Sequence, residues 1–289
     1  LKAYKYRIYP TDEQKILLAK HFGCVRWVYN YGLTTKTKAY QNKERISCLD
    51  VSKKLVELKK HPETTWLSEI NAQSLQMSLR NLDNAYTNFF NKKTNFPKFK
   101  CKNDNNQSFQ CPQRCEIKEG LLRIPKFTEG IKIILHRKFD GKIKTVTISR
   151  NCANRYFASV LVDNGKELLP KKQISTNKSL GIDLGIKHFC VLSNGEKVEN
   201  PNCLKKNLIK LKILQRKFSK TKKGGKNREK LRLKVARLHE HVANQRKDFL
   251  HKLTSKLIKD NQFDTFCLET LSVAEMLKYK KLARGICVV

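Results

Sequence analysis

The sequence predicts an α+β protein of two domains: a small β-barrel with a helical insert over residues 1–178, and a second α/β domain over residues 179–289. Three observations support this prediction. Apolar residues alternate with a period of two at the N-terminus and again after residue 100, which is typical of strands. Between residues 11 and 92 they follow the helical period instead. After residue 178 a strand, a hairpin and two long helices follow, and 289 residues suffice for about two domains.

The N-terminal domain begins with a predicted strand at Lys2–Tyr9, in which successive side chains alternate between two faces. Pro10 ends this strand, because proline has no N–H group to donate to a neighbouring strand. Thr11 and Gln14 have the spacing of a capping box, in which each side chain binds a free backbone N–H group of the other residue. A first helix is therefore expected to begin here.

Two more helices are expected before the strand period returns. Asp50 is the expected N-cap of the second helix, which ends at His61 because a proline follows. The third helix spans about Asn71–Asn91. One of its faces is apolar and consists of Leu75, Leu79, Leu82, Tyr86 and Phe89. Residues 11–92 thus form the helical insert.

The strands of the predicted barrel continue after the helices. A hairpin is expected at Glu116–Ile124, with Gly120 in its turn. Further strands are predicted at Ile131–His136, Lys142–Arg150 and Tyr156–Val162. The polar segment Pro170–Lys178 reads as a linker to the second domain.

The second domain is expected to begin with strands at Leu180–Leu184 and Lys187–Leu192. The turn at Ser193–Gly195 contains Asn-Gly, the strongest short signal for a hairpin. Two long helices follow, separated by Gly224-Gly225. The apolar run Phe263–Leu268 then predicts a buried strand.

The chain carries a large excess of positive charge. It has 61 Lys and Arg residues against 25 Asp and Glu residues, which gives a formal net charge of +36. Such an excess repels itself in a compact protein and indicates a polyanionic partner, with nucleic acid favoured over a membrane surface. The sequence shows neither a spanning apolar stretch nor a signal peptide at its N-terminus. We therefore expect a cytoplasmic protein without a membrane partner.

The two long helices of the second domain hold much of this charge. Between Lys205 and Arg237 there are 15 basic residues and one acidic residue, Glu229. A merely solvated helix face would mix charges of both signs, so the dominance of one sign favours a face that binds phosphates. The residues expected to bind nucleic acid are Lys205, Lys206, Lys210, Arg216, Lys217, Lys222, Lys223, Lys226, Arg228 and, further along, Arg246.

The ten cysteines do not predict a metal centre. Only Cys111 and Cys115 lie close together in the sequence, and a zinc site needs four ligands, usually in two close pairs. We interpret these two as strand cysteines, and the cysteines in general as reduced. Zinc is not expected in this chain.

Two carboxylates stand at the ends of apolar runs, Asp183 near the end of the first strand of the second domain and Glu269 at the end of the last. If these strands are neighbours in one sheet, the two carboxylates converge and could hold Mg²⁺, which prefers a few carboxylate oxygens, waters and substrate phosphate. Metal ions held there would activate water for phosphodiester cleavage. Two simpler roles stay open: Asp183 could shape a turn, and Glu269 could cap a helix that begins at Thr270.

Several motifs between residue 1 and about residue 286 form a recognisable set. They are Lys2–Thr11, Phe96–Lys100 followed by Gln107–Phe109, Gly181–Lys187 with Leu192–Gly195 and Asn200–Pro201, Asn244–Phe249 with His251–Lys252, and Leu268–Leu271. Together they resemble the TnpB (OrfB) family of transposases, which are RNA-guided DNA nucleases encoded by bacterial insertion sequences.

This resemblance implies a wedge-like β-barrel with a helical recognition insert, followed by an RNase H-like domain of the RuvC type. It implies that Asp183 and Glu269 are the first two catalytic carboxylates, with Mg²⁺ as the cofactor. It also implies a guide RNA and double-stranded DNA as partners, because base pairing reads the target sequence in such systems while the protein binds backbone.

The family pattern extends further than this sequence, to a last strand, a third catalytic aspartate and a four-cysteine zinc ribbon. Asp260, Asp264 and Glu275 do not stand where that aspartate belongs. We therefore expect a C-terminally truncated form with an incomplete nuclease domain, which does not cut DNA even with a guide and Mg²⁺.

Two other functions stay open at this point. The chain could be a non-catalytic nucleic-acid-binding remnant or regulator of a mobile element. Alternatively, it could be a transposase that joins DNA ends directly through a related carboxylate site. Metal-dependent strand joining without RNA would favour the latter.

Overall fold

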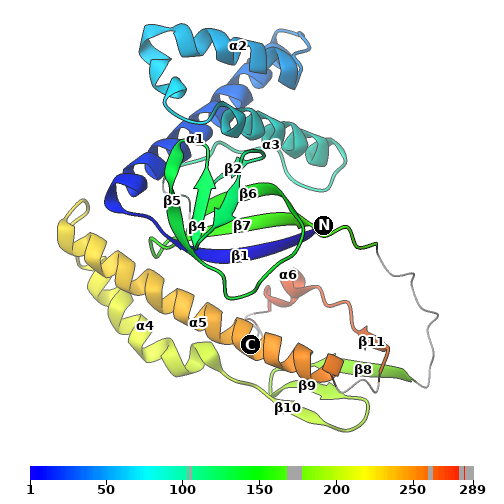
Figure 1. The fold of residues 1–289 in the computed structure, drawn as a ribbon. Helices are drawn as coiled ribbons and strands as arrows, with labels where there is room; N and C mark the ends of the chain where they lie inside the picture. The colour runs from blue at the N-terminus through cyan, green and yellow to red at the C-terminus, as the bar shows by residue number, and fades with distance from the viewer. Residues whose placement is uncertain (103, 105, 168–177, 260–262, 280–282, 284–289) are drawn as a thin grey trace. The chain divides into compact units, whose positions relative to one another are not determined.

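The computed structural model describes residues 1–102, 104, 106–167, 178–259, 263–279 and 283. The chain divides into two compact units, Leu1–Glu167 and Leu168–Val289, and it is a mixed α and β protein (Figure 1). The predicted linker Pro170–Lys178 lies outside the described residues except for Lys178. Among the helices of the described residues, none has the length and apolar character needed to cross a membrane.

The first unit contains the helical insert predicted from the sequence. Its helices are α1 (Asp12–Gln41), α2 (Cys48–Lys60), the 3₁₀ helix η1 (Pro62–Ser68) and α3 (Ala72–Phe90). The predicted capping box of Thr11 and Gln14 is present at the start of α1. Asn71 and Asn91 cap the two ends of α3, so the bounds predicted for the third helix are confirmed.

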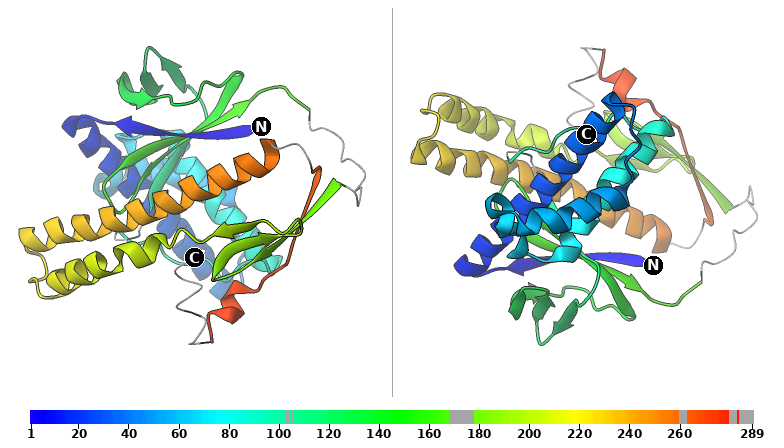
Figure 2. Two further views of the ribbon diagram at one scale, coloured as in Figure 1. Left: turned by 90° about the horizontal axis from the view of Figure 1, so that it is seen from below. Right: turned by 90° about the horizontal axis from the view of Figure 1, so that it is seen from above.

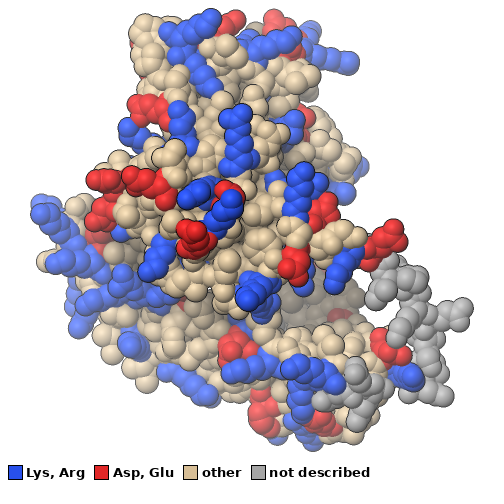
Figure 3. Space-filling model, viewed as in Figure 1, with Lys and Arg blue, Asp and Glu red and all other residues tan. Residues whose placement is uncertain are grey.

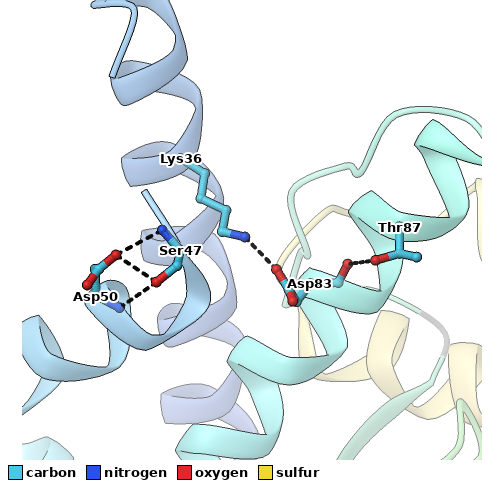
Figure 4. A network of polar contacts seen from close by, with 5 residues as sticks. All are labelled: Lys36, Ser47, Asp50, Asp83 and Thr87. Carbon is cyan, nitrogen blue, oxygen red and sulfur yellow. Dashed lines mark hydrogen bonds and ion pairs between the residues drawn. The ribbon is translucent and has the colours of Figure 1, made fainter. Parts of the chain in front are cut away.

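The start of α2 corrects one prediction. Asp50 is not the N-cap; that position belongs to Ser47, whose Oγ accepts a hydrogen bond from the backbone N–H of Asp50 at 3.2 Å. The Asp50 carboxylate accepts in return from the backbone N–H of Ser47 at 3.0 Å (Figure 4). Ser and Asp are equally good N-caps, and the prediction overlooked the reciprocal pair that Ser47 forms with Asp50 at capping-box spacing.

Helices α1 and α3 pack closely along one side of the first unit. The Ser78 Oγ donates a hydrogen bond to the carbonyl oxygen of Val25 at 2.7 Å inside this contact. At its outer end the Lys36 ammonium lies 2.6 Å from the Asp83 carboxylate (Figure 4). Gly32 permits the close approach, because a Cβ atom there would lie 2.8 Å from a methyl group of Leu79. Of the predicted apolar face of α3, the three leucines are buried.

The sheet of the first unit has seven strands in the order β2-β6-β7-β1-β5-β4-β3. The strands are β1 (Lys2–Tyr9), β2 (Gln107–Cys111), β3 (Glu116–Lys118), β4 (Leu121–Ile124), β5 (Phe127–Ile134), β6 (Lys142–Arg150) and β7 (Tyr156–Asp163). All neighbours are antiparallel, and the sheet is curled, with the helices covering one face (Figures 1 and 2). Closure into a barrel stays a prediction, because β2 and β3 stand at the two ends of this order.

The position of β1 explains why the helices form an insert. This first strand pairs with β7 on one side and with β5 on the other, so the N-terminus lies in the interior of the sheet order. Tyr6 and Ile8 point into the core, where they join residues of the helices and of the later strands. The chain must therefore leave the sheet after Tyr9, form the helices, and return.

Two strand predictions in the first unit need correction. Strand β5 begins at Phe127, earlier than predicted, because Phe127 pairs with Ile124 directly across the two-residue turn Pro125-Lys126. Cys111 does end a strand, but Cys115 lies outside one, after a proline that cannot continue the ladder. The hairpin with Gly120 and the strand Lys142–Arg150 are confirmed.

The second unit combines a four-stranded sheet with a helical hairpin. The strands β8 (Ser179–Leu184), β9 (His188–Leu192), β10 (Lys197–Glu199) and β11 (Thr265–Leu268) form a sheet in the order β10-β9-β8-β11. Helices α4 (Cys203–Ser219) and α5 (Lys226–Lys259) follow β10 in the sequence and lie side by side (Figure 2). Strand β11 comes next in the sequence, and the short helix α6 (Val273–Met276) follows it. The break at Gly224-Gly225 and the turn with Asn194-Gly195 are confirmed.

The core of the second unit is small and lies against its sheet. Leu180, Cys190 and Leu192 are buried there, and Leu253 and Leu257 of α5 pack on them. The predicted buried strand Phe263–Leu268 is wrong in its burial: β11 is at the edge of the described sheet, and the Leu268 side chain is 55% exposed. An apolar run indicates a strand, but it does not tell how many neighbours cover it.

We predict that Ser47→Ala lowers the free energy of unfolding by about 1 kcal/mol, the usual effect of losing a helix cap. The alanine cannot accept the hydrogen bond from the Asp50 N–H group. Denaturant unfolding measures the change. Ser52→Ala, inside the same helix, is the matched control and should be neutral or slightly stabilising, because alanine has the higher helix propensity. Equal effects of the two substitutions would contradict the assignment of the cap.

Candidate functional site

The candidate site of the second unit depends on the pairing of β8 with β11. These strands are parallel, with Leu180 opposite Phe266 and Ile182 opposite Leu268. Asp183 directly follows Ile182, and Glu269 directly follows Leu268. The two acids therefore stand at the same position along the two strands, just beyond the last of these pairs. Both residues line one cleft of about 520 Å³. The structure thus brings the two predicted acids to one cleft, and their role as metal ligands and catalytic residues stays a prediction.

The structure argues against the two simpler roles for these acids. Asp183 lies within β8, opposite Val191 of β9, so it does not shape a turn. Glu269 does not cap a helix at Thr270, because the next helix begins at Val273 and Ser272 occupies its N-cap position. Both side chains are exposed. Within the described part of the chain, neither carboxylate accepts a hydrogen bond or forms an ion pair.

The other wall of the cleft comes from the turn after β9. The Ser193 Oγ accepts a hydrogen bond from the backbone N–H of Gly181 at 3.1 Å, and the Ser193 N–H donates to the Gly181 carbonyl oxygen at 2.9 Å. These two bonds hold Ser193 beside β8, where it lines the cleft together with the two acids. From the sequence, Ser193 is predicted only as a residue of the hairpin turn. The sequence did offer a signal for this position, because a hairpin after β8 and β9 must bring its turn residues back beside β8.

Gly185 has a structural role in this region. Its N–H donates to the Phe189 carbonyl oxygen at 3.2 Å in the turn from β8 to β9. A Cβ atom on Gly185 would lie 3.0 Å from the carbonyl oxygen of His188, so a side chain would press on this turn.

The donor atoms of the cleft are those that hard cations prefer. Asp183 and Glu269 offer carboxylate oxygens, and Ser193 adds a hydroxyl. Among the described residues there is no group of three or more His, Cys, Asp or Glu side chains that could hold a metal ion. The arrangement is thus a carboxylate pair rather than a closed protein cage.

The helical hairpin of α4 and α5 presents the predicted basic surface. Leu211 of α4 and Leu238 and Val242 of α5 are buried along its seam. Eight of the ten basic residues predicted to bind nucleic acid are exposed, namely Lys205, Lys206, Lys210, Arg216, Lys217, Lys222, Lys223 and Lys226. Figure 3 shows Lys and Arg side chains gathered over the end of this hairpin, around the turn between the two helices.

The other two predicted residues are half-buried. Arg228 fastens the turn: its Nη1 donates to the carbonyl oxygens of Phe218 at 3.1 Å and Thr221 at 2.9 Å. Its guanidinium carbon lies 4.2 Å from the centre of the Phe218 ring. Arg246 lies half-buried on α5. For Arg228 the structure thus shows a structural role, and binding of nucleic acid by either residue stays a prediction.

Comparisons with known proteins place the chain among transposon proteins. Residues 159–280 match a family described as "Probable transposase", and residues 1–45 match a model described as "Helix-turn-helix domain". In this structure residues 1–45 form the strand β1 and the long helix α1, so they contain no helix-turn-helix by themselves.

Two curated relatives cover nearly all of this chain. A Streptomyces pristinaespiralis protein named "Putative RNA-guided DNA endonuclease" is 39% identical over 99% of the chain and 70% of its own length. The Escherichia coli K12 protein "Putative RNA-guided DNA endonuclease InsQ" is 32% identical over 96% of the chain and 68% of its own length. The chain thus spans about 70% of these relatives.

Among solved structures, a chain of a CRISPR-Cas12f ternary complex matches with 14% identity and a TM-score of 0.33. The match covers 91% of this chain and 64% of that one.

We predict that Arg228→Ala loosens the hairpin turn and lowers the free energy of unfolding by about 1–2 kcal/mol, because two hydrogen bonds and a cation–π contact are lost. Hydrogen exchange should become faster at residues 219–225. Lys226→Ala removes a charge from the same turn without such contacts and is the matched control. If both variants exchange alike, the structural role of Arg228 is refuted.

Proposed function

This chain belongs to the TnpB (OrfB) family of transposases encoded by insertion sequences, and on that premise we propose that it acts as an RNA-guided DNA endonuclease. The names of two relatives that match almost the whole chain support this proposal. The partners would be a guide RNA and double-stranded DNA. The proposal extends to the fold: a wedge-like barrel in the first unit and an RNase H-like domain of the RuvC type in the second.

One observation carries the catalytic part of this proposal. The parallel register of β8 and β11 brings Asp183 and Glu269 into one cleft, exposed and without partners among the described residues. Two carboxylates that line the same cleft repel each other, and a cation bound by both would relieve this repulsion. A bound cation therefore suits the two acids better than a structural role.

The donor set of the cleft fits Mg²⁺. This ion is commonly bound through one or two carboxylates, with waters and substrate phosphates at its other positions. Asp183 and Glu269 would hold it. When bound, it supplies Lewis-acid stabilisation of the negative charge that develops during phosphodiester cleavage. Ser193, fixed by its two bonds to Gly181, would keep the wall of the cleft in place beside the substrate backbone.

The basic hairpin would bind the phosphates of the guide RNA or the target DNA. Its exposed Lys and Arg residues release counterions when they contact phosphates, which favours binding without regard to base sequence. Such a surface suits a system in which base pairing, rather than side chains, reads the sequence. On this proposal the hairpin provides affinity for nucleic acid, and the cleft with the two acids catalyses cleavage of the phosphodiester bond.

A second candidate function is binding without cleavage. Cleavage with two metal ions uses ligands on both sides of the scissile phosphate. The described residues offer a carboxylate pair and no group of three potential ligands. This observation favours a nucleic-acid-binding member of the family that does not cut, which would regulate the mobile element instead. A cleavage assay with the guide RNA decides between the two functions.

We predict that Asp183→Asn combined with Glu269→Gln removes Mg²⁺ binding in the cleft, because both carboxylate charges are lost while shape is kept. Calorimetric titration with Mg²⁺ or Mn²⁺ measures this. Guide-dependent cleavage should fall by more than about 100-fold, since losing roughly 2.7 kcal/mol of transition-state stabilisation has that effect. Affinity for nucleic acid in EDTA should stay unchanged.

The matched control for this pair is Glu275→Gln on α6, an exposed acid that does not line the cleft. It should leave metal binding and cleavage intact. Metal binding that survives in the double variant would refute the site. If the natural chain binds its guide RNA and target DNA but does not cut in Mg²⁺, the endonuclease proposal is refuted. Binding without cleavage is then the function.

We predict that binding of nucleic acid depends steeply on salt, with a loss of roughly 10³-fold between 50 and 200 mM for six or more phosphate contacts. Reversing Lys222, Lys223 and Lys226 to Glu should weaken binding and reduce the slope against log salt by about 3, since each lost contact contributes roughly 0.9. Fluorescence anisotropy over a salt series measures both quantities.

The control for the hairpin variant reverses three exposed lysines of the first unit, Lys53, Lys54 and Lys92, and therefore changes the net charge equally. It should reduce the slope much less than the hairpin variant. A flat salt titration of the natural chain, or equal losses in the two variants, would show that the hairpin does not bind phosphates.

A further inference from the structure

Two cysteines of the first unit lie at the turn between β2 and β3. Cys111 is the last residue of β2 and is buried. Cys115 directly precedes β3, is half-buried, and lines a surface cleft of about 710 Å³. Both are free thiols, and we call them the turn thiols. The proposed nuclease uses neither of them, so their placement needs another explanation.

The turn folds back and brings the two sulfur atoms side by side. The Cys115 Sγ lies 3.4 Å from the carbonyl oxygen of Cys111, to which its S–H group donates. Arg114 precedes Cys115 and has a φ of 56°, a left-handed backbone that reverses the chain direction. The two thiols also form a hydrogen bond with each other. The sulfur atoms therefore stand where a disulfide could join them.

The hydrogen bond between the turn thiols makes one of them easier to ionise. It lowers the pKa of the Cys111 thiol, although burial opposes this, and hydrogen bonds with Ser74 and Asn71 lower the pKa further. The same hydrogen bond, together with burial, raises the pKa of the Cys115 thiol. The pair thus shares one negative charge, and proton transfer across the hydrogen bond can place that charge on either sulfur. The thiolate is the reactive form of cysteine.

The surroundings of Cys111 differ from those of a cysteine that only fills the core. Its Sγ lies 3.7 Å from the Ser74 Oγ in the first turn of α3. The aligned peptide dipoles at the start of a helix favour a thiolate there. Cys24 on α1 lies in the core by contrast, and burial raises the pKa of its thiol to about 11. Packing alone therefore does not account for the environment of Cys111.

The cleft beside Cys115 attracts small anions. One acidic residue lines it, Glu116, whose carboxylate lies 2.6 Å from the Lys118 ammonium. Four basic residues line it as well, namely Arg114, Arg123, Lys142 and Lys144. Lys144 is paired with Asp163 at 3.4 Å, and the other three outnumber the single acid. Glutathione disulfide carries a net negative charge at neutral pH, so this cleft would concentrate it near Cys115.

We propose that the turn thiols are a modification site, which closes to a disulfide in exchange with a small anionic disulfide such as glutathione disulfide. The Cys115 thiolate attacks one sulfur of glutathione disulfide, forms a mixed disulfide and releases one glutathione thiolate. The Cys111 thiolate then attacks the Cys115 sulfur and releases the second. Each released thiolate takes up a proton that the protein thiols gave up. Two protein thiols are thus oxidised, and one small disulfide is reduced to two thiols.

Closure would stiffen the connection of this turn to the helical insert. Gln113, inside the turn, accepts a hydrogen bond from the Gln73 side chain of α3 at 2.8 Å. Just before the turn, the carbonyl oxygen of Gln110 accepts one from Ser74 Oγ at 2.7 Å. A disulfide between these two contacts should slow hydrogen exchange at residues 112–116. The site goes beyond the proposed function and does not depend on it.

The test exposes the full chain to glutathione buffers of rising disulfide content at a fixed total of glutathione, and then alkylates free thiols at acid pH. Trypsin cleaves after Arg114, so the turn thiols fall into peptides 103–114 and 115–118, which only a disulfide keeps joined. Mass spectrometry quantifies the joined peptides. We expect half-closure at a ratio of disulfide to thiol roughly tenfold or more below that which modifies half of Cys101, a single exposed cysteine.

Two variants identify the role of each thiol. Cys111→Ser removes the thiol that resolves the mixed disulfide, so glutathione should stay attached to peptide 115–118. Cys115→Ser should abolish both the mixed disulfide in this turn and the joined peptides. High salt should slow closure by glutathione disulfide, because it screens the charges of the cleft, but not closure by the uncharged hydroxyethyl disulfide.

The decisive measurement needs no variant. If the natural chain forms no joined peptides at a ratio that already modifies Cys101, the inference is overturned. Joined peptides that form as fast in urea as in the folded chain overturn it too, because the fold then contributes nothing. So does a response to salt that is the same for both small disulfides, since the cleft then does not select an anion.

Discussion

The parallel pairing of β8 with β11 is the constraint on which the candidate site depends. The two strands are separated in the chain by β9, β10 and the whole helical hairpin, yet Ile182 stands directly opposite Leu268. Successive side chains of a strand point to opposite faces, so a slip of one residue would send one of the two carboxylates to the other face. Leu180 is buried under Leu253 and Leu257 of α5, and this packing helps to keep the register. The core thus positions the acids without touching them.

The helical hairpin stays folded although its surface charges repel one another. Its outer surface is almost uniformly positive, which disfavours a compact structure. Apolar residues along the seam hold the two helices together, and Arg228 fastens the turn between them. Only a few exposed ion pairs occur on α5 among the described residues, such as that of Glu229 with Arg232 at 2.6 Å. Because stability comes from the seam and the turn, most surface cations stay free to bind phosphates.

Sequence patterns predicted those features that rest on neighbouring residues. Strands with strict alternation, such as Lys142–Arg150, and helices with clear caps, such as α3, have the predicted bounds. The two acids could also be singled out from the sequence, because each stands at or near the end of an apolar strand. Features that depend on residues far away in the sequence could not be predicted in this way. Leu268, for example, is exposed, and its strand β11 lies at the edge of the described sheet.

The placement of opposite charges in this protein implies that metal and nucleic acid bind cooperatively at the proposed site. The overall charge of +36 attracts phosphates to the molecule. Asp183 and Glu269 face a substrate there with two negative charges of their own, so a phosphate meets local repulsion in their cleft. A divalent cation held by the two carboxylates would reverse the sign of that interaction. By linkage, the substrate would strengthen cation binding by the same free energy by which the cation strengthens substrate binding. On the proposed function, a carboxylate pair that holds Mg²⁺ only weakly by itself would therefore hold it more tightly once the nucleic-acid backbone is bound.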